Sequence, residues 1–248
     1  MVGVRRRGAR ESAEEASVIL VVVPSDPPTE PGVGRGAPPD DDTNSRRAAA
    51  IAGHRADEAG ARLALGAADA NTAAAGLAAL VRMGAVSGDD LARALTASAA
   101  GLRRRAAELA ASAATTDSRL DALLTLALGD KDSLVVEAAC FALGERREGM
   151  AEAQVSDVVA QLSTVSAGNA DAHVREAAVA ALGAIGDPGG LPAVLAALTD
   201  RPTIRRRAAV ALSAFDDDGA EAALHRCLED RDWQVRAVAE TLLDLPPS

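Results

Sequence analysis

The stretch that decides the fold is residues 173–188, "HVREAAVAALGAIGDP", because its pattern returns along the chain. From an anchor at Val174, the residues four and eight positions later are Ala178 and Leu182. Residues spaced by four drift slowly around a helix of about 3.6 residues per turn, so they form one stripe. The segment is therefore predicted to be a helix that packs against neighbours along this stripe.

The same frame starts at five further anchors, which lie 30, 33, 39, 30 and 31 residues apart when Val174 is included. These anchors are Thr72, Leu102, Val135, Ile204 and Val235. The residue four positions after each anchor is always small: Gly76, Ala106, Ala139, Ala178, Ala208 and Ala239. A small side chain there allows a neighbouring helix to come close. Self-similarity at this period is typical of repeat architectures.

A second set of helices is predicted between the first. The segments "LDALLTLAL" (120–128), "VSDVVAQL" (155–162) and "LPAVLAAL" (191–198) all carry apolar residues at amphipathic spacings. Polar turns separate the two sets. Because helices of about 10–12 residues are marginal alone, each must bury its stripe on its neighbours.

The expected fold is therefore an all-α solenoid of five to six helical hairpins over residues 43–248. The interval of 39 residues predicts a longer helix or loop near residues 145–170.

Residues 1–42 are expected to form a disordered tail or linker, because residues 24–42 contain six of the eleven prolines and could not form a packed face. Upstream, a basic "RRRGAR" and a short apolar "SVILVVV" are interrupted by the acidic "ESAEE". This order is unlike a signal peptide, and the apolar run is too short to span a membrane. The expected location is cytoplasmic.

The net charge of −10 opposes general binding to nucleic acids and to anionic membranes. Aromatic residues make up only 1% of the chain, so the core must consist of Ala, Leu and Val. The two cysteines, Cys140 and Cys227, lie in Ala/Leu-rich helices and are expected to be reduced and buried.

The segment "DAHVREAAVAALGAIGDPGGLPAVLAALTDRPTIRRRAAVALSAFDD", residues 171–217, resembles the HEAT-like repeats of the phycobilisome-lyase type. The matching features are the turn aspartate, the Val/Ile–Arg pair and the Ala-Ala-x-Ala-Leu-Gly tail. The resemblance is strong over residues 130–243 and weaker over 43–129. Two copies depart, since Val136 and Ala73 occupy the arginine position. The resemblance implies a right-handed superhelix, a fold that hosts many functions.

In HEAT-like repeats, arginines just after the anchor bond turn aspartates of neighbouring units, and the resemblance implies such a ladder here. The expected donors are Arg103, Arg175, Arg205 and Arg236, and the expected acceptors are Asp130, Asp171, Asp200, Asp230 and Asp232. The alternative is that the same arginines bind a partner.

No catalytic residue, metal site or cofactor is predicted. His173 precedes its anchor at a helix cap, and the three histidines lie far apart in the sequence. HEAT-like deoxyhypusine hydroxylases bind iron with His-Glu pairs, but the histidines here are followed by Arg55, Val174 and Arg226. A lyase-like enzyme or accessory factor remains an alternative, although scarce aromatics suit a tetrapyrrole poorly. A nucleic-acid or anion-binding protein is a second alternative, through the arginine triplets 103–105 and 205–207.

The favoured function is a non-catalytic scaffold or adaptor that binds a partner protein along the concave face of the solenoid. Position six after each anchor is expected to point into the curve. The candidate residues of this surface are Glu137, Phe141, Glu176, Ala180, Arg206, Val210 and Thr241. For Phe141, packing against the longer segment at 145–170 is the competing interpretation.

Overall fold

The structure is a computed structural model that describes residues 41–113 and 117–245. Over these ranges it contains thirteen α-helices and two short 3-10 helices, and no strand. The prediction of an all-α solenoid is confirmed. The helices belong to one compact unit, Pro39–Ser248. Residues 1–40 of the predicted tail lie outside the described residues, whereas Asp41 and Asp42, which were also assigned to the tail, belong to the first helix. No described helix is long and apolar enough to cross a membrane.

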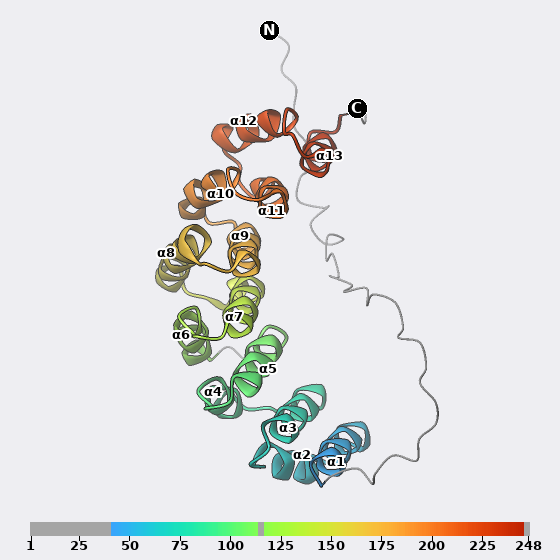
Figure 1. The fold of residues 1–248 in the computed structure, drawn as a ribbon. Helices are drawn as coiled ribbons and strands as arrows, with labels where there is room; N and C mark the ends of the chain where they lie inside the picture. The colour runs from blue at the N-terminus through green and yellow to red at the C-terminus, as the bar shows by residue number, and fades with distance from the viewer. Residues whose placement is uncertain (1–40, 114–116, 246–248) are drawn as a thin grey trace, which may run out of the picture. The chain divides into compact units, whose positions relative to one another are not determined.

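Within this unit the helices form two rows, and the inner row lies on the concave side (Figure 1). The inner row consists of α1 (Asp41–Arg55), α3 (Ala70–Arg82), α5 (Ala100–Ala110), α7 (Ser133–Glu145), α9 (Ala172–Ile185), α11 (Pro202–Leu212) and α13 (Trp233–Leu242). The outer row consists of α2 (Glu58–Leu65), α4 (Gly88–Leu95), α6 (Ser118–Ala127), α8 (Glu152–Gly168), α10 (Leu191–Ala197) and α12 (Asp218–Cys227).

Each outer helix and the inner helix that follows it form one hairpin, and α1 precedes the first of these hairpins. The longer interval between anchors corresponds to the 3-10 turn Arg147–Gly149 and to α8, which has 17 residues. The extra residues therefore lengthen an outer helix and leave the inner row regular.

The small residues of the repeated stripe allow the inner helices to pack closely. Ala106, Ala139, Ala178, Ala208 and Ala239 all have no exposed surface, as the notion of a packed stripe requires. Close approach also occurs at glycines: a Cβ added to Gly183 of α9 would lie 2.7 Å from the Cβ of Ala211 in α11. A core of small residues therefore replaces aromatic volume with short distances between helices.

Candidate functional site

Three arginines of the inner row hold aspartates of the next hairpin. Each uses Nε and Nη2 on the two carboxylate oxygens: Arg103 on Asp130 at 2.7 and 2.8 Å, Arg175 on Asp200 at 2.8 and 3.0 Å, and Arg205 on Asp230 at 2.8 and 2.7 Å. The Nη1 atom of each donates to a backbone carbonyl just before its own helix. Each arginine therefore ties two successive turns together.

The paired arginines also set the ionisation of the aspartates. Hydrogen bonds from Arg103, Arg175 and Arg205 hold the pKa of their partner carboxyls below the ordinary value, although partial burial opposes this. The carboxylates therefore stay ionised in structural ion pairs and are poor candidates for a general acid.

The prediction that Asp171, Asp232 and Arg236 take part in the arginine–aspartate ladder was wrong. The carboxylates of Asp171 and Asp232 accept the backbone N–H groups of His173 and Gln234, both at 2.9 Å, and so cap α9 and α13. These N-cap positions hold the carboxylate against the first turn of its own helix. Arg236 has no following hairpin in the described chain, and its Nη1 donates to the backbone oxygen of Asp230 at 2.8 Å.

At α7 the ladder lacks both the arginine and the aspartate of a pair. Val136 occupies the arginine position of α7, and Asn169 occupies the aspartate position of the following turn. The Oδ1 of Asn169 accepts the backbone N–H of Asp171 at 2.9 Å, as Asp130 accepts that of Asp132 at 2.9 Å. Asparagine keeps the turn but offers no charge, so the site that lacks a donor also lacks a carboxylate.

The six arginines of the two triplets all have hydrogen-bond or ion-pair partners within the chain. Besides the ladder bonds of Arg103 and Arg205, the remaining four arginines also have partners within the chain. Arg104 and Arg105 pair with Glu108 at 3.4 and 2.9 Å, Arg207 pairs with Glu176 at 3.5 Å, and Arg206 donates to Gln234 at 3.1 Å. This pairing weakens the case for an anion site.

A buried ion pair that sequence reasoning missed joins α7 to α6. The Nε of Arg146 lies 2.6 Å from Oδ1 of Asp121, and only 8% and 4% of the two side chains are exposed. Arg146 also donates to the carbonyl of Ala110 at the end of α5. Neither residue occupies a repeated position, so the repeat pattern gave no signal for this contact.

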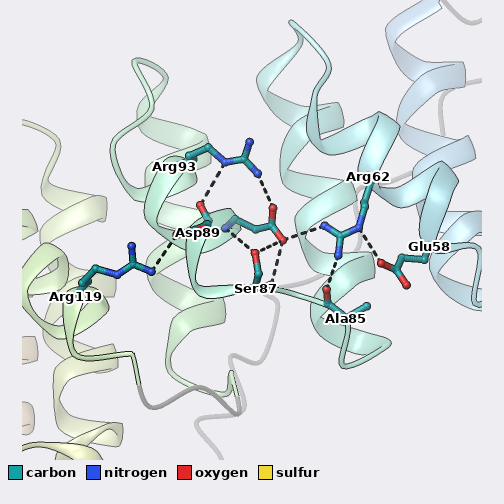
Figure 2. Close-up of polar contacts among 8 residues, drawn as sticks. Glu58, Arg62, Ala85, Ser87, Asp89, Arg93 and Arg119 are labelled. Atoms are coloured by element: carbon teal, nitrogen blue, oxygen red, sulfur yellow. Dashed lines mark hydrogen bonds and ion pairs between the residues drawn. The ribbon is translucent and has the colours of Figure 1, made fainter.

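A second missed network surrounds the N-terminus of α4 in the outer row. It extends from Glu58 and Arg62 on one side to Asp89 and Arg119 on the other (Figure 2). At its centre Asp90 is buried and accepts hydrogen bonds from Arg62 at 3.2 Å and Arg93 at 2.6 Å. Burial raises the pKa of Asp90, but these bonds and those from Ser87 lower it overall. All these groups have partners within the network, so it is a structural element.

The seven candidate surface residues all lie on inner-row helices and none is buried. Phe141 and Val210 are large apolar side chains with 54% and 42% exposure. The exposure of Phe141 argues against packing on the longer α8 segment. Sequence reasoning overlooked Glu145, which is also exposed on α7, one helical turn beyond Phe141.

A shallow depression lies between α9 and α11 on this row. It encloses about 220 Å³. Its lining consists of Ala180, Gly183, Ala184, Arg207, Val210, Ala211, Ser213 and Ala214. Two of the candidate residues therefore border a hollow with a mostly small, apolar floor.

The described residues do not gather chemically reactive groups. No cluster of three or more His, Cys, Asp or Glu side chains that could hold a metal ion occurs among them. Cys140 and Cys227 are free and buried, and burial raises the pKa of the Cys140 thiol to about 12. A thiol with such a pKa stays protonated at neutral pH and is a poor nucleophile. His173 is exposed at its helix cap.

Comparison with known proteins places these features in a family. A profile of HEAT repeats matches residues 120–211 and 159–244, which together span about half of the chain. Comparison with curated protein sequences gives no match.

Several solved structures are similar in fold. YibA of Escherichia coli is 16% identical, with 85% of this chain and 77% of YibA covered and a TM-score of 0.57. The designed armadillo repeat protein YIII(Dq)4CqI is 17% identical, with 74% and 97% covered and a TM-score of 0.55. A second designed armadillo repeat protein, in complex with the peptide (KR)4, is 14% identical, with 83% and 99% covered and a TM-score of 0.53.

Proposed function

Because this chain belongs to the HEAT-repeat family, we propose that it is a non-catalytic scaffold that binds a partner protein along its inner row of helices. The fold alone does not decide this, since one fold serves many functions. The proposal rests on which side chains the inner row leaves exposed.

The observation that carries the proposal is the row of exposed residues on the concave side. Phe141 and Val210 leave much of their apolar surface in water, and they lie on α7 and α11 with Ala180 of α9 in the helix between them. Exposed apolar residues that cluster, rather than scatter singly, mark interaction surfaces. A solenoid presents such a row as an extended surface on which a partner is held at several points.

The charged groups support a binding role over a catalytic one. The ladder carboxylates, the arginine triplets and the Asp90 network all have partners within the chain. Both cysteines are buried. A lyase-type activity would need a reactive group beside a ligand cavity, and the α9–α11 depression is lined by alanine, glycine, valine and serine with a single charged residue, Arg207.

The test replaces Arg206 and Val210 together. The variant Arg206→Ala/Val210→Ala is expected to reduce capture of the native partner in affinity purification from the host, with an unchanged helical circular dichroism spectrum. Both side chains are at the surface, so their loss removes contacts with the partner and little of the core.

A matched control removes one arginine and one aliphatic residue from the outer row. Arg226 of α12 and Leu126 of α6 are both exposed, and the variant Leu126→Ala/Arg226→Ala should capture the partner as the wild type does. Equal capture by the inner-row variant and the wild type would show that the assigned face is wrong.

A further inference from the structure

The exposed face of α7 is a single narrow stripe. Glu137, Phe141 and Glu145 are exposed and follow one another at intervals of four residues. The residues between them are all buried: Ala138, Ala139, Cys140, Ala142, Leu143 and Gly144. Because α7 packs against α5 and α9 on its two sides and against α6 behind, the stripe opens towards the concave side (Figure 1).

The two glutamates of this stripe differ from the glutamates of the adjacent inner-row helices α5 and α9. Glu108 and Glu176 are engaged by arginines of the triplets. Glu137 and Glu145 form no ion pair with any described residue. An aromatic ring that is about half exposed thus lies between two carboxylates that are free to meet a cation.

Aliphatic surface continues from this stripe onto the next helices. Ala180 and Ala184 of α9 occupy the repeat positions of Phe141 and Glu145, so small side chains stand beside the ring and the second carboxylate. They border the depression between α9 and α11, and Val210 forms part of its lining. The surface is therefore anionic and aromatic at α7. At α9–α11 it is hollow and mainly aliphatic, and Arg207 of the lining is paired with Glu176.

We propose that this surface binds an extended segment of the partner that carries both basic and large aliphatic side chains. One lysine or arginine lies over the ring of Phe141 between Glu137 and Glu145, and an aliphatic side chain fills the depression beside Val210. A cation over an aromatic face is attracted by the ring quadrupole, and the two carboxylates supply the opposite charge. An acidic segment would meet Glu137 and Glu145 as like charges. This inference rests on the proposed function and specifies its ligand.

The test measures fluorescence anisotropy of a labelled octapeptide that alternates arginine and leucine, with a peptide that alternates glutamate and leucine for comparison. The full chain is expected to bind the basic peptide saturably and to show no binding of the acidic peptide. The affinity for the basic peptide should fall as the salt concentration rises. Phe141→Ala should weaken binding roughly five-fold, the size of an exposed cation–π contact of about 1 kcal/mol. Glu137→Gln/Glu145→Gln should weaken it roughly three- to ten-fold.

The matched control is Glu221→Gln/Glu229→Gln, which changes the net charge equally at two exposed positions on, and just after, the outer helix α12. Binding by this variant should equal that of the wild type. The proposal is overturned if the basic peptide does not bind, if it binds no better than the acidic one, or if the control loses as much affinity as the stripe variant.

Failure of this ligand proposal can be distinguished from failure of the proposed scaffold function. If the peptide experiment fails while Arg206→Ala/Val210→Ala still loses the native partner, the scaffold stands and only the ligand chemistry is wrong. If partner capture is insensitive to every inner-row substitution, the scaffold proposal itself fails.

Discussion

Arg205 of α11 holds Asp230, in the turn before α13, through two parallel hydrogen bonds of 2.8 and 2.7 Å. Both side chains are largely sheltered, with 5% and 15% exposure. Because the same arginine also donates to the carbonyl of Asp200, it joins the turn before α11 to the turn before α13. The contact between hairpins is thus polar at the turns and apolar along the helices.

Arg205→Ala is expected to lower the free energy of unfolding by about 3 kcal/mol, because it leaves the sheltered carboxylate of Asp230 without its partner. Arg236→Ala is the matched control. It occupies the same repeat position but gives only one hydrogen bond, to the carbonyl of Asp230, so its loss should cost about 1 kcal/mol or less. Urea unfolding followed by circular dichroism measures both. Equal losses would show that the carboxylate bonds contribute little.

The ladder also predicts a dependence on pH. The folded-state pKa of Asp230 is lowered, first by the hydrogen bond from Arg205, so its contribution to stability is complete above the unfolded pKa of about 3.9 and is lost as pH falls through the folded value. The difference in stability between wild type and Arg205→Ala should therefore shrink as pH falls from 6 to 3. A difference that stays constant over this range would contradict the assignment.

The ladder pair that is missing at α7 can be introduced by mutation. In a double-mutant cycle, Val136→Arg alone should destabilise the protein, because Val136 is buried and Asn169 offers no charge. Adding Asn169→Asp should recover part of this loss, with a favourable coupling of about 1 kcal/mol. Thermal unfolding of the four variants measures the coupling. A coupling of zero would mean that the backbone at α7 and the α8–α9 turn does not place the two positions as the other pairs are placed.

The repeat could be predicted from sequence because it depends on local spacing. Ala178 and the small residues at the equivalent positions of the other repeats lie at a spacing that places them on one face of a helix. All of them are buried in the structure. The same period predicted which arginines follow the anchors. It did not distinguish Asp171, an N-cap, from Asp200, a ladder acceptor, because the two occupy turn positions only a few residues apart in the repeat. They differ in their donors, which are a backbone N–H for Asp171 and a guanidinium for Asp200.

Contacts outside the period could not be predicted. Arg146 reaches Asp121 from the end of α7, and nothing in the spacing of the two residues repeats elsewhere. The free carboxylate of Glu145 was overlooked for a related reason. Its significance depends on the absence of a pairing arginine among the described neighbours, which only the three-dimensional arrangement reveals.

The central claim is that a partner protein lies against the inner row. It is tested most directly by placing a photoreactive benzoylphenylalanine at position 141 of α7 and, in a separate protein, at position 126 of α6. Leu126 is an exposed apolar residue of the outer row, with 74% exposure against 54% for Phe141, so both probes are accessible. Irradiation with the native partner should give a cross-linked product from position 141 and none from position 126. A product from position 126 alone would contradict the account.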